Sequence, residues 1–217
     1  MALKLFLHPL SSYCHKVLIA LYENNTPFEP VFVDLSDPSA PATLEMKRLW
    51  PVGMFPVLQD EAAGRVIPES SIIIEYLDQH FPGKTRFIPA DPDLARQSRL
   101  RDRFCDLHLH VHMQKFSGDG RRPEGSKDPY GAEAARKAII AAYGMLVSDL
   151  GDKTWLMGED FSLADCAAAP ALSYASMMVP FGEEHAPVVR YLDRLKARPS
   201  YARVLEEAEP YMAMFRS

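Results

Sequence analysis

The sequence predicts an α/β plus all-α fold class, with an α/β domain followed by an all-helical domain, within 217 residues. Two observations indicate this division. Up to residue 82, apolar residues alternate in strand-like runs that are separated by helical stretches. Beyond residue 82, they recur only at helical spacing. Residues 83–92 are rich in proline and are expected to form a linker, so the predicted domains are residues 1–82 and 93–217.

The first domain opens with a β-α-β unit. Apolar residues alternate along residues 3–7 and again along residues 31–35, as expected for two strands. Between them, residues 13–21 place apolar side chains at the spacing of an amphipathic helix. A crossover of this length usually joins parallel strands, so we expect the two strands to lie parallel in one sheet.

A hairpin and a second helix complete the first domain. Residues 55–58 and 65–67 are short apolar runs joined by a turn that contains Gly64. The next helix is expected over residues 70–81, with a serine at its start and Pro82 at its end. The stretch between the second strand and the hairpin is expected to be irregular. The predicted order is therefore β-α-β followed by β-β-α.

The second domain is expected to be a bundle of helices. Four apolar residues from Leu100 to Val111 fall on one helical stripe, and another helix is expected from about residue 130 to residue 150. The stretch between these two helices, residues 117–131, is rich in glycine, proline and charged residues and is expected to form a loop.

Capping and proline mark the remaining helices. Ser162 and Asp165 form a capping-box signature, in which each side chain accepts a hydrogen bond from the backbone of the other residue. Two shorter helices are expected at about 185–197 and 200–209, where Pro199 separates them.

Composition and charge exclude several classes of protein. Hydrophobic residues make up 47% and charged residues 24%, which excludes disordered, collagen-like and coiled-coil chains. The net charge of −5 has the wrong sign for binding nucleic acid or an anionic membrane surface. The longest apolar run, Ala138–Val147, is shorter than the roughly 18 residues that span a bilayer. We therefore expect neither nucleic acid nor a membrane as a partner.

Cysteine content and the N-terminus favour a cytoplasmic location. The three cysteines, Cys14, Cys105 and Cys166, are far apart and odd in number, which does not fit a disulfide framework. The first residues lack the apolar core of a secretory signal. A reducing compartment is therefore expected.

A candidate anion site lies where the first strand leads into the first helix. Ser11 and Ser12 stand at the start of this helix, where unpaired N–H groups carry a partial positive charge. A hydroxyl placed there can stabilise an anion, although helix capping alone also explains a serine. Cys14 lies on the apolar stripe of the helix, where a thiol is usually an inert hydrophobic residue.

Two further segments can bind a ligand. Pro56 opens a strand, a position compatible with a cis Phe55–Pro56 bond that turns the backbone of Phe55 toward an extended ligand. Glu69 and Ser70 open the following helix. Ser70 and the helix N–H groups can bind a carboxylate while Glu69 takes an ammonium, so this pair suits the amino-acid end of a zwitterionic ligand.

These segments in this order, together with the Ser162–Asp165 capping box, resemble the cytosolic glutathione S-transferases over essentially the whole chain. The pattern is similar to that of the serine-type, zeta- or theta-like bacterial members. The resemblance implies a thioredoxin-like first domain and a helical second domain. It also implies a homodimer, with glutathione as co-substrate and no metal.

The resemblance assigns roles to individual residues. Ser11 matches the hydroxyl that donates to the glutathione sulfur, with Ser12 as the second candidate. Phe55, before Pro56, matches the residue whose backbone binds the cysteinyl part of glutathione. Glu69 and Ser70 match the pair that holds the γ-glutamyl end. The implied reaction is attack of the glutathione thiolate on a small hydrophobic electrophile, a cytoplasmic detoxification reaction.

Three histidines raise the question of a metal. At roughly 100° per residue, His108 and His112 fall on one side of a regular helix while His110 falls on the other, so the three cannot share one ion. No third ligand for His108 and His112 is evident, and a metal is not expected. In the resembling family this helix lines the electrophile pocket, which makes His108 and His112 candidate pocket residues.

The sequence departs from the family pattern at Met54. Many relatives carry a lysine there that can hold the glycyl carboxylate; Lys47, Arg48 or His15 are candidate replacements.

Three alternatives to conjugation remain open. They are glutathione-dependent isomerisation, thiol–disulfide exchange through a low-pKa Cys14, and a non-catalytic glutathione S-transferase-like binding protein.

Overall fold

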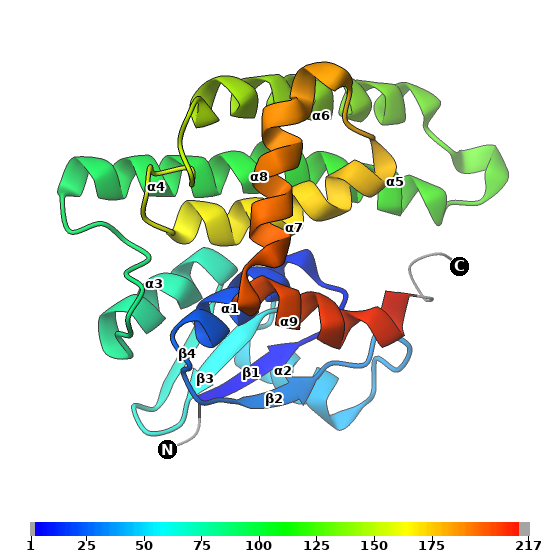
Figure 1. Ribbon diagram of the computed structural model, residues 1–217. Coiled ribbons are helices and arrows are strands. Elements are labelled where there is room, and N and C mark those ends of the chain that lie inside the picture. Colours follow the sequence, from blue (N-terminus) through cyan, green and yellow to red (C-terminus); the bar gives the residue numbers. More distant parts are fainter. Residues whose placement is uncertain (1–2, 213–217) are drawn as a thin grey trace. The chain divides into compact units, whose positions relative to one another are not determined.

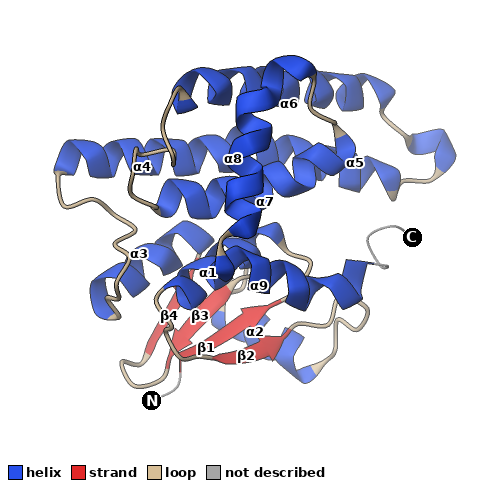
Figure 2. Ribbon diagram, in the orientation of Figure 1, coloured by secondary structure: helices blue, strands red, loops and turns tan. Residues whose placement is uncertain are grey.

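The chain folds into two compact units. The computed structural model describes residues 3–212 (Figure 1). One unit contains the chain up to Ile88 together with the chain from Arg198 onward, and the other is Pro89–Ala197. All the strands among the described residues lie in the first unit (Figure 2). No helix among the described residues combines the length and the apolar character needed to cross a bilayer.

The first unit contains the predicted β-α-β and β-β-α elements, one helix that was not predicted, and a C-terminal helix. Its elements are β1 (Leu3–Leu7), α1 (Ser12–Glu23), β2 (Glu29–Phe32), α2 (Pro41–Leu49), β3 (Val57–Asp60), β4 (Arg65–Pro68), α3 (Ser70–His80), α9 (Pro199–Ala208) and the short 3₁₀ turn η4 (Glu209–Tyr211). The strands form one sheet in the order β2-β1-β3-β4. β1 and β2 are parallel, while β3 is antiparallel to both β1 and β4, as the crossover and the hairpin predict.

Helix α2 corrects the prediction of an irregular stretch before the hairpin. Pro41 occupies its first turn, where a missing N–H costs nothing, and Met46 inserts into a core cluster with Phe6 and Val57. Only two residues of this helix are buried, so its apolar periodicity is too short to be recognised in the sequence. Because Phe6 and Val57 face α2, their strand neighbours Leu5 and Leu58 face the opposite side of the sheet.

The second strand begins and ends earlier than predicted, at residues 29–32 instead of 31–35. β2 ends at Phe32, and Leu35 is 56% exposed. The reason is local, because Asp34 Oδ1 accepts hydrogen bonds from the backbone N–H and the hydroxyl of Ser36. This side chain turns the backbone away from the sheet.

Helix α9 belongs to the first unit, whereas the sequence predicts one helical domain over residues 93–217. Arg198 donates two hydrogen bonds to Glu23, at 2.9 and 2.7 Å, and the Glu23 side chain is only 5% exposed. Burial by itself raises the pKa of Glu23, but hydrogen bonds from Arg198 and other donors outweigh it and lower the pKa. This pair joins the end of α1 to the start of α9.

The second unit consists of helices and short helical turns. Its elements are α4 (Pro92–Cys105), the π-helical turn η1 (Asp106–His110), α5 (Val111–Gly120), the 3₁₀ turn η2 (Glu124–Ser126), α6 (Pro129–Leu150), α7 (Leu163–Met178), the 3₁₀ turn η3 (Glu183–His185) and α8 (Ala186–Ala197). The predicted capping box is present at the start of α7. Helices α4 and α7 pack closely against each other.

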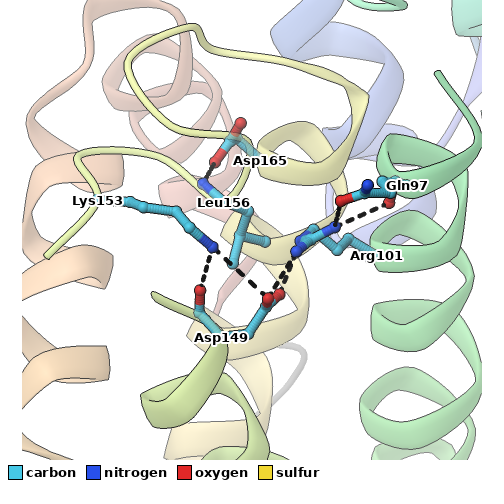
Figure 3. A network of polar contacts seen from close by, with 6 residues as sticks. All are labelled: Gln97, Arg101, Asp149, Lys153, Leu156 and Asp165. Atoms are coloured by element: carbon cyan, nitrogen blue, oxygen red, sulfur yellow. Dashed lines mark hydrogen bonds and ion pairs between the residues drawn. The ribbon is translucent and has the colours of Figure 1, made fainter. Parts of the chain in front are cut away.

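Two carboxylates hold the second unit together (Figure 3). Asp149, at the end of α6, accepts two hydrogen bonds from Arg101 of α4 at 2.7 and 2.6 Å. Asp165 accepts a hydrogen bond from the backbone N–H of Leu156 at 2.9 Å, which fixes the loop before α7. Asp149 therefore joins two helices that are far apart in the sequence, whereas Asp165 joins α7 to the loop directly before it.

The prediction of a loop over residues 117–131 is wrong at both ends. α5 extends to Gly120, and α6 already begins at Pro129. Asp128 caps α6 by accepting from the Gly131 N–H at 2.8 Å, and the Asp128 N–H donates to Asp119 at 2.8 Å. These side-chain hydrogen bonds stabilise the end of α5 and the start of α6, although the glycines nearby favour a loop.

The predicted apolar stripe exists but faces solvent within its own unit. Leu100 is 65% exposed, and Leu107 and Val111 are both 46% exposed. The buried side of this region instead contains small and polar residues, among them Asp102 and Cys105. Periodicity identifies the stripe, but only the packing shows which face of the helix lies in the core.

Candidate functional site

Three segments that the sequence singled out meet at one end of the sheet. Phe6 of β1 pairs with Val57 of β3, and Val57 pairs with Pro68 of β4, so these residues form one row across three strands. The chain leaves β1 and β4 at this row and enters β3 there. The segments that follow or precede the row carry Ser11 and Ser12, Phe55 and Pro56, and Glu69 and Ser70.

Ser11 is the N-cap of α1. Its backbone is extended (φ −80°, ψ 116°), and its Oγ accepts a hydrogen bond from the Cys14 N–H at 3.2 Å. A hydroxyl that accepts one bond still has its own hydrogen to donate. Ser12, the first residue of the helix, is 6% exposed. Ser11 can therefore cap the helix and donate a hydrogen bond to a ligand at the same time.

Cys14 is not a reactive thiol. Its side chain is fully buried, and burial raises its pKa to about 12 although Ser11 and the His8 backbone act in the opposite direction. All three cysteines of the chain are free and buried. The raised pKa disfavours a thiolate at Cys14 at neutral pH, which argues against the thiol–disulfide exchange hypothesis.

The Phe55–Pro56 peptide bond is cis, one of the two conformations that the position of the proline allows. The Phe55 side chain packs against a core cluster that includes Phe6 and Val57. Phe55 is therefore anchored by its ring, while its backbone lies at the edge where β3 begins.

Glu69 has an unusual backbone conformation, with φ of +68° at the start of α3. A non-glycine residue with positive φ is uncommon and is found disproportionately at functional sites. Its carbonyl accepts from the Ile73 N–H at 2.8 Å, which continues into the helix. Glu69 is exposed, whereas Ser70 is only 6% exposed.

The structure separates the three candidate replacements for a lysine at Met54. A Cβ added at Gly53 would lie 3.8 Å from Lys47 Cγ, so the Lys47 stem runs beside the segment that leads into Phe55. Arg48 is held by Glu45 through two hydrogen bonds of 2.8 Å. His15 is 1% exposed and contacts the Pro9 carbonyl at 2.6 Å. Lys47 is thus the cation that lies next to this segment.

Two family models match the chain. The "Glutathione S-transferase, N-terminal domain" matches residues 5–85, and the "Glutathione S-transferase, C-terminal domain" matches residues 104–199. The chain belongs to the glutathione S-transferase family. The match confirms the predicted family, its two-part fold and the assignment to the transferases.

Alignments with individual relatives of this family member cover nearly its whole length. Glutathione S-transferase U25 of Arabidopsis thaliana is 33% identical over 205 residues, which cover 92% of this chain and 86% of the relative. A stringent starvation protein A homolog of Coxiella burnetii is 29% identical over 211 residues, which cover 94% of this chain and 92% of the relative.

A solved structure shows the same fold. The glutathione S-transferase of Methylobacterium radiotolerans, in complex with glutathione sulfonate, superimposes with a TM-score of 0.82 at 28% sequence identity over 94% of each chain.

In this family member, the candidate electrophile-pocket residues lie in the second unit. His108 is exposed, with its ring centroid 5.1 Å from that of Phe104, and His112 is partly buried. The π-helical turn η1 includes His108, so the angle of 100° per residue used to place these histidines does not apply. Their role in the pocket stays a prediction. Within residues 3–212, no group of three or more His, Cys, Asp or Glu side chains could hold a metal ion.

Sequence reasoning missed His8 in this glutathione S-transferase. His8 follows β1 directly, is 6% exposed, and contacts both the turn before α1 and the ring of Phe55. A single histidine between a strand and a helix forms no pattern, so no sequence signal could have found it.

Proposed function

We propose that this protein binds glutathione at the end of its sheet and conjugates it to a small hydrophobic electrophile. The observation that supports this function best is the row formed by Phe6, Val57 and Pro68, because it gathers the three candidate binding segments at one place. Conjugation of this kind is a detoxification reaction. A cytoplasmic location fits it, since all three cysteines are free and buried.

The proposed chemistry is the activation of a thiol that belongs to the ligand. A free thiol has a pKa near 8.5, and only the thiolate is a nucleophile. The Ser11 hydroxyl donates a hydrogen bond to the sulfur, and the N-terminus of α1 adds a partial positive charge; both favour the thiolate. The thiol proton passes to water. The sulfur then forms a bond to the electrophilic carbon. In a substitution, the displaced electron pair departs with the leaving group; in an addition, it is protonated.

The remaining site residues position glutathione. The Phe55 backbone pairs with the cysteinyl part, in the manner of a short added strand. Ser70 and the first N–H groups of α3 bind the γ-glutamyl carboxylate, while Glu69 binds its ammonium. Lys47 takes the glycyl carboxylate in place of a lysine at Met54, because its stem lies beside Gly53.

Removing the γ-glutamyl pair is expected to weaken glutathione binding by about 10²- to 10⁴-fold. Each of Glu69 and Ser70 contributes a charge-assisted hydrogen bond of roughly 1.5–3 kcal/mol. Calorimetric titration of glutathione into the wild type and the Glu69→Ala, Ser70→Ala double variant measures this loss. Glu29→Gln, an exposed carboxylate of β2, is the control and is expected to bind as the wild type does. A wild type that does not bind glutathione would contradict the proposal.

A non-catalytic glutathione-binding protein is the second candidate. One relative over almost the whole chain is named a stringent starvation protein A homolog and not a transferase. Glutathione binding without conjugation over a broad panel of electrophiles, and unchanged binding in Ser11→Ala, would favour this candidate.

We also propose that a second copy of the chain covers the exposed stripe of the second unit. A groove of about 480 Å³ between α4 and α6 is lined by Leu100, Phe104 and Met145, and Leu100 and Met145 are 65% and 61% exposed. Apolar side chains exposed side by side mark interaction surfaces, and the same patch on two copies is self-complementary. Arg101 and Asp149, whose hydrogen bonds are drawn in Figure 3, also line this groove.

Charges placed in this groove are expected to give a monomer. In Leu100→Asp with Met145→Asp, two carboxylates would be buried without partners if the dimer formed. Light scattering after size exclusion measures the mass. Met177→Asp is the matched control, since Met177 is 54% exposed on α7 outside the groove, and it is expected to stay a dimer. A wild type that is monomeric, or a groove variant that stays dimeric, would refute this assignment.

A further inference from the structure

His8 makes two contacts that shape the turn carrying Ser11. The imidazole Nδ1 accepts a hydrogen bond from the Leu10 N–H at 3.2 Å. The His8 carbonyl accepts a second bond from the Ser11 N–H at 3.0 Å. The three residues between β1 and the N-cap of α1 are therefore closed into a turn by one residue, through both its side chain and its backbone.

The His8 ring also connects this turn to two other segments. Its centroid lies 6.4 Å from the Phe55 ring, at an interplanar angle of 39°. It lies 6.1 Å from the Tyr211 ring, at 70°. Aromatic pairs at these separations attract one another beyond simple burial. A single buried side chain thus contacts the turn before Ser11, the residue before the cis proline, and the C-terminal turn η4.

The acceptor role of Nδ1 requires a neutral imidazole with its hydrogen on Nε2. Burial lowers the pKa of His8, and the nearby charge of Asp34 opposes this effect only in part. The neutral form is therefore present at neutral pH, and the hydrogen bond from Leu10 is maintained.

We propose that His8 is a positioning residue for the glutathione site, which holds the Ser11 hydroxyl and the Phe55 backbone in register with each other. The proposal rests on the proposed function, because it assumes that these two groups bind the cysteinyl part of glutathione. His8 itself does not donate to the sulfur; it acts through the turn that it closes and the ring that it packs against. Misplacing a catalytic group by about 1 Å can lower the rate about 100-fold.

Three substitutions separate the hydrogen bond that His8 Nδ1 accepts from the packing of the His8 ring. His8→Asn keeps an acceptor, since its Oδ1 occupies the position of Nδ1 and side chains of this type accept from the N–H two residues on. His8→Phe keeps the ring but has no acceptor. His8→Ala removes both. His80→Ala, an exposed histidine at the end of α3, is the matched control.

The measurements are kcat/KM for conjugation and the pKa of the bound glutathione thiol, followed by the ultraviolet absorbance of the thiolate. His8→Phe and His8→Ala are expected to lower kcat/KM by about 10- to 100-fold and to move the thiol pKa toward its free value. His8→Asn is expected to retain most of the activity and a depressed thiol pKa. His80→Ala is expected to equal the wild type. A merely structural role would lower the melting temperature without moving the thiol pKa.

Hydrogen exchange gives a readout that does not depend on glutathione. In His8→Phe and His8→Ala, the amides of Leu10 and Ser11 are expected to exchange faster than in the wild type, while those of β3 stay protected. If the wild type binds glutathione and His8→Phe leaves both the thiol pKa and the exchange unchanged, the role assigned to His8 is wrong. If the wild type does not bind glutathione, the proposed function fails instead.

Discussion

Replacing Ser11 by alanine is expected to lower kcat/KM for glutathione conjugation by about 10²- to 10³-fold, which is the usual effect of removing one donor from a stabilised anion. The physical reason is that the sulfur loses the hydrogen bond that favours its charged form, so that less of the bound glutathione is thiolate at neutral pH. Steady-state kinetics and the absorbance of the bound thiolate measure both effects. A bound thiol pKa that stays unchanged in Ser11→Ala would exclude Ser11 as the donor.

The capping role of Ser11 has to be separated from its donor role. Its Oγ accepts from the Cys14 N–H, so Ser11→Ala is also expected to destabilise the fold by about 1 kcal/mol. Ser11→Asp is the matched control, because a carboxylate caps a helix equally well but has no hydrogen to donate. This variant is expected to regain stability and to remain inactive. Recovered activity in Ser11→Asp would show that capping alone matters.

Ser12→Ala distinguishes the second candidate. Ser12 lies within α1 and is 6% exposed, so the change is expected to alter the rate much less than Ser11→Ala does. The reverse order of effects would assign the sulfur contact to Ser12.

Replacing Asp165 by alanine is expected to lower the free energy of unfolding by about 4 kcal/mol or more, since four buried donors lose their partner and each costs roughly 1–3 kcal/mol. Asp165 is fully buried. Its Oδ1 accepts from the Leu156 N–H at 2.9 Å and from the Tyr191 hydroxyl at 2.6 Å. Its Oδ2 accepts from the N–H and the hydroxyl of Ser162 at 2.9 and 3.1 Å. Burial raises the pKa of Asp165, and these four bonds oppose the rise.

Urea denaturation measures this loss, and two variants define its origin. Tyr191→Phe removes a single donor and is expected to cost about 1 kcal/mol, far less than Asp165→Ala. Asp160→Ala, an exposed carboxylate in the same loop, is expected to leave the midpoint nearly unchanged. If Asp165→Ala unfolds at the same urea concentration as Asp160→Ala, the network of Asp165 is not what stabilises the start of α7.

Local patterns predicted the strands and the hairpin because side chains alternate with a period that the sequence shows directly. They failed where the element is short or irregular. Helix α2 buries only Thr43 and Met46, and the π-helical turn η1 is closed by backbone bonds whose register no side-chain pattern reports. The ends of α5 and α6 depend on Asp119 and Asp128, whose bonds offset the glycines nearby.

The candidate site residues were predictable because they stand at positions where the residue type has a local structural meaning. Ser11, Pro56 and Glu69 stand at the junctions of strands and helices, where backbone groups are unpaired and where proline and serine have positional meaning. His8 was not predictable, because its contacts run to Leu10, Phe55 and Tyr211 and form no repeating pattern.

The sequence by itself determined the family and the β-α-β and β-β-α order of the first domain, because these depend on residue type and on spacing along the chain. It also indicated the candidate glutathione-binding residues, whose roles stay a prediction. Only the tertiary structure decided that Cys14 is buried with a raised pKa, that the Lys47 side chain lies beside Gly53, and that Leu100, Leu107 and Val111 are exposed. The physical reason is that burial and proximity are set by contacts between distant residues. A thiol, a cation or an apolar face has the same local pattern whether it lies in the core or in solvent.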